Sequence, residues 1–294
     1  MSQQAPESTL CVLEQIHSLP LPLEQARFRH YPGMKLGQLP QIAFFGEQLG
    51  ARALEVLHTD PHHEWVMTAP PYHQLPAAAN LLARHVHTLL QQPGRNLPLI
   101  EPRLGQQQIE IRSQEEFKTF YDYSKNSLQQ RIQERQRLQQ IQDADQLAPR
   151  FKNRNVIIIN DIYVTGTQQQ FLQQMFTQFQ VHACYWFYIF QVESALAQAH
   201  PEIEHQINNS QITDLDSYAK VLADSDTRHT ARSISRLFNE EIDNFSYVLA
   251  RLPPGVQQHL YQLALKEGRY GHPMFQPKMQ LLATPPGLLP GIHL

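Results

Sequence analysis

The segment with the clearest chemical potential is residues 156–168, VIIINDIYVTGTQ, in which three isoleucines lead to Asp161 and a short loop with Gly166 follows. At the carboxyl end of a strand and the start of a helix, backbone N–H groups can converge on an anion. Gly166 lets the backbone approach closely, and the hydroxyls of Thr165 and Thr167 add donors. Asp161, at the end of the strand, is placed to bind sugar hydroxyls. The segment therefore predicts a sugar-phosphate site, although the spacing alone leaves an ordinary strand–turn–helix connection open as the alternative.

The same segment resembles the signature for phosphoribosyl pyrophosphate (PRPP) in type I phosphoribosyltransferases. That signature joins a hydrophobic strand and two acidic residues to a loop of the pattern Thr/Ser–Thr–Gly–x–Thr. The apolar strand, Asp161, Ile162, Thr165 and Gly166 stand in register with it. Within the family, the resemblance is nearest to competence-associated phosphoribosyltransferase-like proteins, and it covers residues 28–192.

The resemblance implies a role for each part of the segment. It implies that Asn160 and Asp161 bind the ribose hydroxyls at the catalytic centre. It also implies a loop that holds the 5′-phosphate and consists of Val164, Thr165, Gly166, Thr167 and Gln168. The sequence departs from the family pattern twice, because Asn160 stands where an acid is usual and Gln168 stands where a hydroxyl residue is usual.

Two further segments resemble binding elements of the same family. An apolar run ends in a double proline, and the resemblance implies a pyrophosphate-binding loop there, formed by Ala69, Pro70, Pro71 and Tyr72. Residues 113–150 are polar and match the position of a mobile basic loop that closes over PRPP. The cations expected to neutralise pyrophosphate in that loop are Lys125, Arg131 and Arg135. A solvated helix face is the alternative reading for each of them.

The elements that must position these residues follow from hydrophobic patterning. Residues 155–160 predict a strand buried on both faces, as in a parallel sheet. A helix at 168–180 and a strand at 181–192 complete a strand–loop–helix–strand unit, which should close right-handed. Further predicted elements are helices at 41–58 and 76–90 and strands at 64–69 and 97–100. We therefore predict an α/β fold like that of type I phosphoribosyltransferases, with a Rossmann-like parallel sheet flanked by helices.

The last third of the chain has a different character, because helical patterns dominate after residue 205. The predicted helices are 214–223, 227–250 and 254–267. Residues 272–294 are rich in proline and are expected to run extended over the surface. We divide the chain into a phosphoribosyltransferase-like α/β domain, 1–204, and a helical C-terminal appendage, 205–294. In the family a variable hood covers the base, and the N-terminal segment, the tail or both could supply it here.

Composition and charge disfavour several classes of function. The chain has 294 residues, of which 41% are hydrophobic and 17% charged, so it can bury a core. Its net charge of -3 disfavours a nucleic-acid partner. Two cysteines favour a reducing compartment, and no apolar run is long enough to predict a membrane span, so we expect a cytoplasmic protein. We assign no metal ligands, because Pro61 interrupts the histidines near residue 60 and favours a polar loop.

Two functions from different classes follow. The first is an enzyme that binds PRPP, with Mg2+ held through PRPP, and transfers phosphoribosyl to a base or nucleotide with release of pyrophosphate. The second is a non-catalytic sensor of PRPP or a nucleotide, whose helical tail binds a partner. A degenerate fold kept as a scaffold is a third reading, and a homodimer is compatible with all of them.

Overall fold

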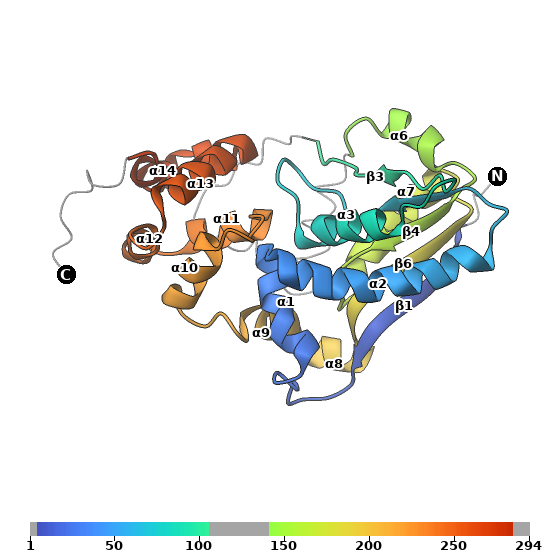
Figure 1. The fold of residues 1–294 in the computed structure, drawn as a ribbon, viewed down its shortest axis with the longest axis horizontal. Helices are drawn as coiled ribbons and strands as arrows, with labels where there is room; N and C mark the ends of the chain where they lie inside the picture. Colours follow the sequence, from blue (N-terminus) through green and yellow to red (C-terminus); the bar gives the residue numbers. More distant parts are fainter. Residues whose placement is uncertain (1–4, 106–140, 285–294) are drawn as a thin grey trace.

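The centre of the fold is a parallel β-sheet, seen in the computed structural model, which describes residues 5–105 and 141–284 (Figure 1). Its strands run in the order β1-β6-β4-β2-β3, and β5 pairs with β6 beyond the end of β4. The strand bounds are β1 (Glu7–Ile16), β2 (Trp65–Thr68), β3 (Leu99–Ile100), β4 (Asn155–Ile159), β5 (Ile162–Tyr163) and β6 (Ala183–Val192). Every pairing among these strands is parallel, which confirms the predicted sheet.

Strand β4 shows why this sequence forms a central parallel strand. Its side chains alternate between two cores, with Val156 and Ile158 on one face and Ile157 and Ile159 on the other. All four are fully buried. A central parallel strand is covered by helices on both faces, so its apolar side chains do not alternate with polar ones.

Helices cover both faces of the sheet. The core with Ile157 and Ile159 also takes apolar side chains from α1, α2 and α3, and the core with Val156 and Ile158 takes them from α6 and α7. The bounds are α1 (Ala26–Leu36), α2 (Leu39–Thr59), α3 (Ala78–Leu90), α6 (Ala144–Phe151) and α7 (Thr167–Gln178). Helices α2, α3 and α7 and strands β2, β3 and β6 stand where the patterning predicted them, whereas β1 and α1 were not predicted.

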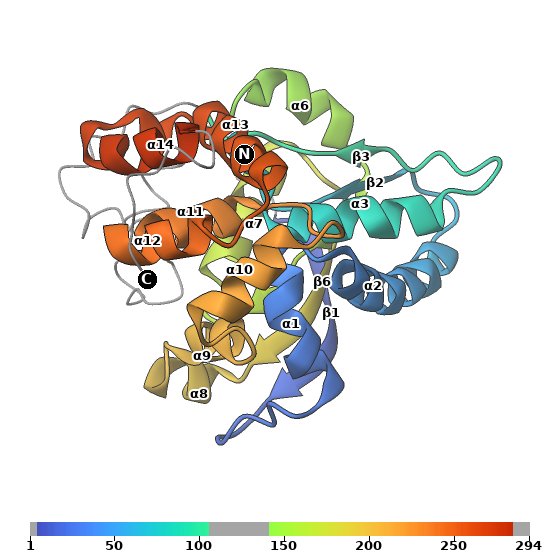
Figure 2. The ribbon, with the colours of Figure 1, turned by 60° about the vertical axis from the view of Figure 1, so that its left-hand side comes forward.

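The C-terminal helices form a core of their own beside α1 (Figures 1 and 2). That core includes Tyr218, Phe238 and Leu260, and it also takes Leu36 from the end of α1. The bounds are α8 (Ser194–Ala199), α9 (Ile203–Asn209), α10 (Leu215–Ala223), α11 (Ala231–Asn239), α12 (Ile242–Leu249), α13 (Pro254–Glu267), η2 (Arg269–Gly271), η3 (Pro273–Phe275) and α14 (Gln276–Ala283). The division of the chain at residue 205 stays a prediction.

Two expectations for this region are wrong. The single helix predicted over 227–250 is broken between α11 and α12. At this break the buried amine of Lys278 donates to the carbonyl of Phe238 at 2.9 Å and to that of Glu240. Residues 276–283, predicted to be extended, form helix α14 and bury Met279 in the C-terminal core. Proline near the first position of a helix starts it rather than breaks it, which explains the second error.

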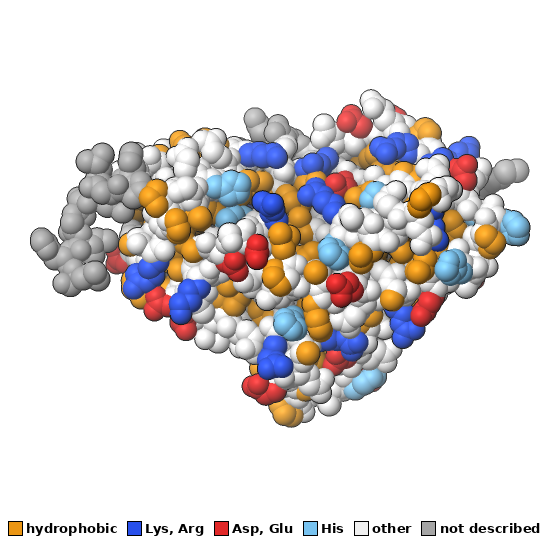
Figure 3. Space-filling view, viewed as in Figure 1, with side chains coloured by type: hydrophobic (Ala, Val, Ile, Leu, Met, Phe, Trp, Pro, Cys, Tyr) orange, Lys and Arg blue, Asp and Glu red, His pale blue; other side chains and the backbone are white. Residues whose placement is uncertain are grey.

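The surface and the helices add two observations. Side chains of both charge signs are interspersed over the face shown in Figure 3, in keeping with the net charge of -3. Among the described helices, none combines the length and the apolar character needed to cross a bilayer.

Candidate functional site

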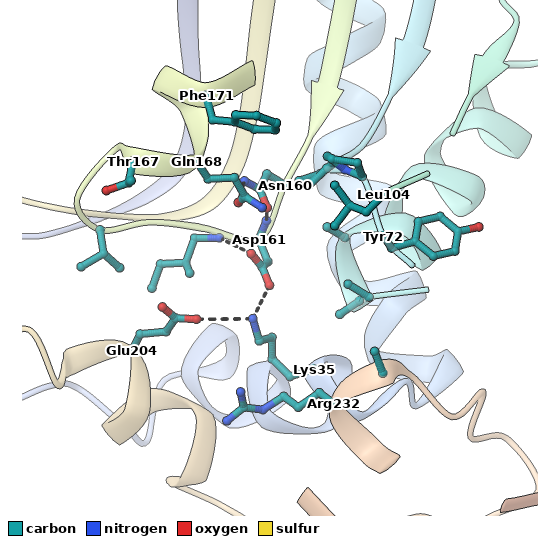
Figure 4. Close-up of a pocket in the computed structure, with 18 of the residues that line it drawn as sticks. Lys35, Tyr72, Leu104, Asn160, Asp161, Thr167, Gln168, Phe171, Glu204 and Arg232 are labelled. Atoms are coloured by element: carbon teal, nitrogen blue, oxygen red, sulfur yellow. Dashed lines mark hydrogen bonds and ion pairs between the residues drawn. The ribbon is translucent and has the colours of Figure 1, made fainter. Parts of the chain in front are cut away.

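A cavity of about 320 Å³ lies at the carboxyl ends of β4 and β2, where the two predicted binding loops meet (Figure 4). One wall is residues 160–168, and another is residues 70–73. Both segments directly follow parallel strands, so their loops open at the same edge of the sheet. Ala69, expected in the pyrophosphate loop, directly precedes the wall 70–73 and is buried in the core that includes Ile157 and Ile159. Its role toward pyrophosphate stays a prediction.

The end of β4 places two polar side chains in a nearly dry setting. Asn160 and Asp161 are 2% and 9% exposed. One carboxylate oxygen of Asp161 accepts the backbone N–H of Ile162 at 2.8 Å, which fixes the orientation of the carboxylate. The Asn160 amide donates to Oε1 of Gln168 at 2.9 Å, and its oxygen accepts the N–H of Asp161 at 2.9 Å. The two departures from the family pattern, Asn160 and Gln168, are therefore hydrogen-bonded to each other.

A lysine that the sequence analysis did not single out completes this corner of the site. The ammonium of Lys35, from the last turn of α1, donates to the second carboxylate oxygen of Asp161. It also lies 3.6 Å from a carboxylate oxygen of Glu204, which comes from α9. The three side chains are 12%, 13% and 15% exposed, and all three line the cavity (Figure 4).

The loop before α7 has the geometry of an anion site. Gly166 has φ +69°, and a Cβ at that position would lie 2.5 Å from the hydroxyl of Tyr163. The hydrogen-bond ladder of α7 begins with the N–H of Gln170, which donates to the carbonyl of Gly166 at 2.9 Å. The first N–H groups of a helix have no partner within it, and the positive end of the helix dipole lies at the same place. Thr165 and Thr167 add hydroxyls that lie 2.9 Å apart.

The loop at 70–73 is fixed, but it offers few donors. Pro70 and Pro71 have no N–H, and the N–H of Tyr72 donates to the carbonyl of Pro102 at 3.4 Å. The guanidinium of Arg103 lies 3.8 Å from the centre of the Tyr72 ring. This loop therefore offers few backbone amides to the cavity, and its role toward pyrophosphate stays a prediction.

The C-terminal helices and η2 supply another part of the cavity lining. Arg232 comes from α11, Glu267 from the end of α13, and Arg269 from η2. Glu267 forms an ion pair with Arg269 and accepts the N–H of Leu75 at 3.0 Å. Both the N-terminal helix α1 and the C-terminal helices thus contribute to the cavity lining. Which of them covers the base stays a prediction.

His73 also lines the cavity, and it stays neutral over the physiological range. Burial, together with the positive charge of Arg269, lowers its pKa from 6.5 to about 4. The unfolded chain takes up this proton near pH 6.5, whereas the folded protein takes it up near pH 4. Between these values the unfolded state binds more protons, so the free energy of unfolding should fall as the pH is lowered from 6.5 to 4.

Urea unfolding of the wild type and of His73→Gln at pH 7 and pH 5 tests this. We expect the variant to lose less stability on acidification than the wild type does. His62→Gln, at an exposed position on a loop, is the matched control and should follow the wild type. An identical pH response in all three proteins would contradict the pKa assignment.

Some residues predicted to belong to the site lie outside the part of the chain that the structure describes. Other residues of the site could not be predicted from the sequence. Lys125, Arg131 and Arg135 lie outside the described residues. Lys35 sits in a helix with Pro32 and Gly33 in its interior, so no amphipathic pattern marked that segment. Glu204 had no sequence signal either, because its role depends on the packing of α9 against α1.

A comparison with protein families identifies the family of the chain. A family model described as PRTase ComF-like matches residues 28–282. The match extends past residue 192, where the resemblance in the sequence ended, and includes the helices that help to line the cavity. No curated protein matches the chain significantly. The match spans most of the chain, including both segments at the strand ends, and so the chain belongs to the ComF-like phosphoribosyltransferase (PRTase) family.

Proposed function

We propose that this protein binds PRPP and transfers its phosphoribosyl group to a nitrogenous base, with release of pyrophosphate. One observation carries the proposal. The strand-end pair Asn160 and Asp161 and the glycine-containing loop 164–168 form one wall of one cavity. A carboxylate for hydroxyl groups therefore lies next to a helix N-terminus for a phosphate, as a 5-phosphoribosyl ligand requires.

Each part of the wall has a role in this proposal. Asp161 accepts hydrogen bonds from the ribose, and Asn160 positions Gln168 beside it. The N–H groups at the start of α7 and the hydroxyls of Thr165 and Thr167 hold the 5′-phosphate. Lys125, Arg131 and Arg135 would neutralise the pyrophosphate, as the family resemblance implies.

Mg2+ enters the proposal as part of the substrate. No three His, Cys, Asp or Glu side chains gather as a metal site within residues 5–105 and 141–284. Mg2+ binds readily to substrate phosphate oxygens and retains water, so it would arrive bound to PRPP.

In the transfer reaction, the bond between ribose C1 and the pyrophosphate oxygen breaks, and pyrophosphate leaves with the electron pair. A nitrogen lone pair of the base then forms the new bond to C1, and the base gives up a proton to solvent.

A second function, binding of PRPP or a nucleotide without transfer, is favoured by one observation. The ammonium of Lys35 neutralises Asp161, and Asn160 brings no charge of its own. Negative charge near the ribose would stabilise the positive ring that forms as pyrophosphate leaves. A ribose carboxylate whose charge is offset by an adjacent ammonium suits a sensor whose tail transmits occupancy to a partner.

Pyrophosphate release distinguishes the two functions. The full chain is incubated with Mg2+ and PRPP, with and without a panel of purine, pyrimidine and pyridine bases. Transfer predicts pyrophosphate that appears in proportion to the enzyme only when one of the bases is present. If calorimetry shows saturable PRPP binding but no base leads to pyrophosphate release, the protein is a sensor and not a transferase. Absence of both binding and release would overturn both functions.

A further inference from the structure

The ion pair between Lys35 and Asp161 joins parts of the chain that are 126 residues apart, and it lies inside the cavity rather than on the surface. Side chains that are this buried give up hydration, so a charged pair there needs a good geometry to persist. Glu204, 3.6 Å from the same ammonium, supplies a second negative charge on its other side. Figure 4 shows Lys35 between the two carboxylates.

A vicinal diol is the ligand group that suits an ammonium beside a carboxylate. Each hydroxyl of a diol can donate one hydrogen bond and accept others, and a carboxylate can only accept while an ammonium can only donate. One hydroxyl can therefore donate to Asp161 while its neighbour accepts from Lys35. Asn160 is less suited to this task, because both ends of its amide are hydrogen-bonded, to Gln168 and to the N–H of Asp161.

We infer that Lys35 is a specificity-determining residue, which recognises the ribose diol together with Asp161, and that Glu204 holds its ammonium in position. The inference rests on the sugar-phosphate site proposed above and applies equally to an enzyme and to a sensor. Tyr31 supports the arrangement from one turn earlier on α1, where its ring centre lies 5.7 Å from the ammonium. Hydrogen bonds to charged groups are stronger than those between neutral groups, so the loss of one diol hydroxyl should weaken ligand binding strongly.

Two consequences follow for ligand binding. The site should prefer ribose 5-phosphate to 2-deoxyribose 5-phosphate, because the second sugar lacks one hydroxyl of the diol. The preference should persist without Mg2+, because the ammonium already provides the positive charge at the Asp161 carboxylate.

Calorimetric titration of the full chain with each of the two sugar phosphates, in buffer with EDTA, tests both consequences. The wild type is expected to bind the ribose form at least about tenfold more tightly, the factor for one hydrogen bond to a charged group. Lys35→Met, which removes the ammonium and leaves an uncharged side chain one atom shorter, should bring the two affinities within about twofold, because the loss falls on the ribose form. Lys220→Met, at an exposed position on α10, is the matched control and should keep the wild-type preference.

Several outcomes of this titration would contradict the inference. Binding of both sugars by the wild type without preference, or a full preference in Lys35→Met, overturns it and leaves the sugar-phosphate site standing. Binding of neither sugar by the wild type also overturns the inference, and titration with PRPP and Mg2+ then decides separately whether the proposed function stands. If Lys35→Met does not fold, Glu204→Gln decides, because it keeps the pair with Asp161 but releases the other side of the ammonium. A preference as large as that of the wild type in Glu204→Gln would then overturn the inference.

Discussion

Replacing Asp161 with asparagine is expected to weaken PRPP binding by roughly 10- to 100-fold, the effect of losing hydrogen bonds to a buried charged group. The carboxylate is oriented by the N–H of Ile162 and its side chain is only 13% exposed, so water cannot easily replace it. Asparagine keeps the size of the side chain but removes the charge and one acceptor. Lys35 retains Glu204 as a partner, which should keep the variant folded.

Calorimetry with PRPP and Mg2+ measures this effect, and circular dichroism shows whether the variant is folded. Asp216→Asn is the matched control, because Asp216 is a half-exposed aspartate on α10 that also pairs with a basic side chain, Arg251, at 2.6 Å. The control should bind PRPP as the wild type does. Equal affinities for Asp161→Asn and the wild type would mean that the end of β4 does not bind the sugar.

The parts of the fold that the sequence predicted are those with a strong local pattern. Three isoleucines in β4 and the aromatic run of β6 lie in the middle of the sheet, where both faces are buried. The loop at 164–168 was accessible to prediction for the same reason, because strand, glycine and helix follow each other directly. A local pattern fixes local geometry, and here the candidate phosphate loop is local.

The parts that could not be predicted depend on packing between distant segments. Strand β1 lies at the edge of the sheet and is exposed over its first four residues. Its apolar run, residues 10–13, is only four residues long and lies between polar residues, so it did not stand out as a strand. Lys35 lies far from Asp161 in the sequence, and nothing near it resembles a site. The C-terminal helices pose the same problem, because the place of Arg232 on the cavity wall follows from how α11 packs beside α1.

The second large effect is expected at Gly166. Alanine there must adopt φ +69°, at a cost of about 1–2 kcal/mol for a residue other than glycine. Its Cβ would also lie 2.5 Å from the hydroxyl and 2.9 Å from the adjoining ring carbon of Tyr163. That ring packs edge-on against Tyr188 at 5.6 Å, which restricts its movement. The loop backbone must therefore shift to remove the clash, and the N–H groups at the start of α7 would no longer converge on one point.

Gly166→Ala should consequently lose most of the contribution of the phosphate to binding. The comparison of ribose 5-phosphate with ribose isolates that contribution, and the ratio of their affinities should fall by roughly 100-fold, as when two charge-assisted hydrogen bonds are lost. Gly255→Ala is the control, because a Cβ there meets no atom within 4 Å and its φ is ordinary.

The double variant Tyr163→Ala/Gly166→Ala separates the two causes of the expected loss. It removes the ring that a Cβ at residue 166 would meet, but it leaves the backbone strain in place. Recovery of phosphate binding in the double variant would identify the contact with Tyr163 as the cause, whereas a persistent loss would identify the left-handed backbone. Full phosphate binding by the single variant Gly166→Ala would contradict both, because it would mean that the phosphate lies elsewhere in the cavity and that α7 does not hold it.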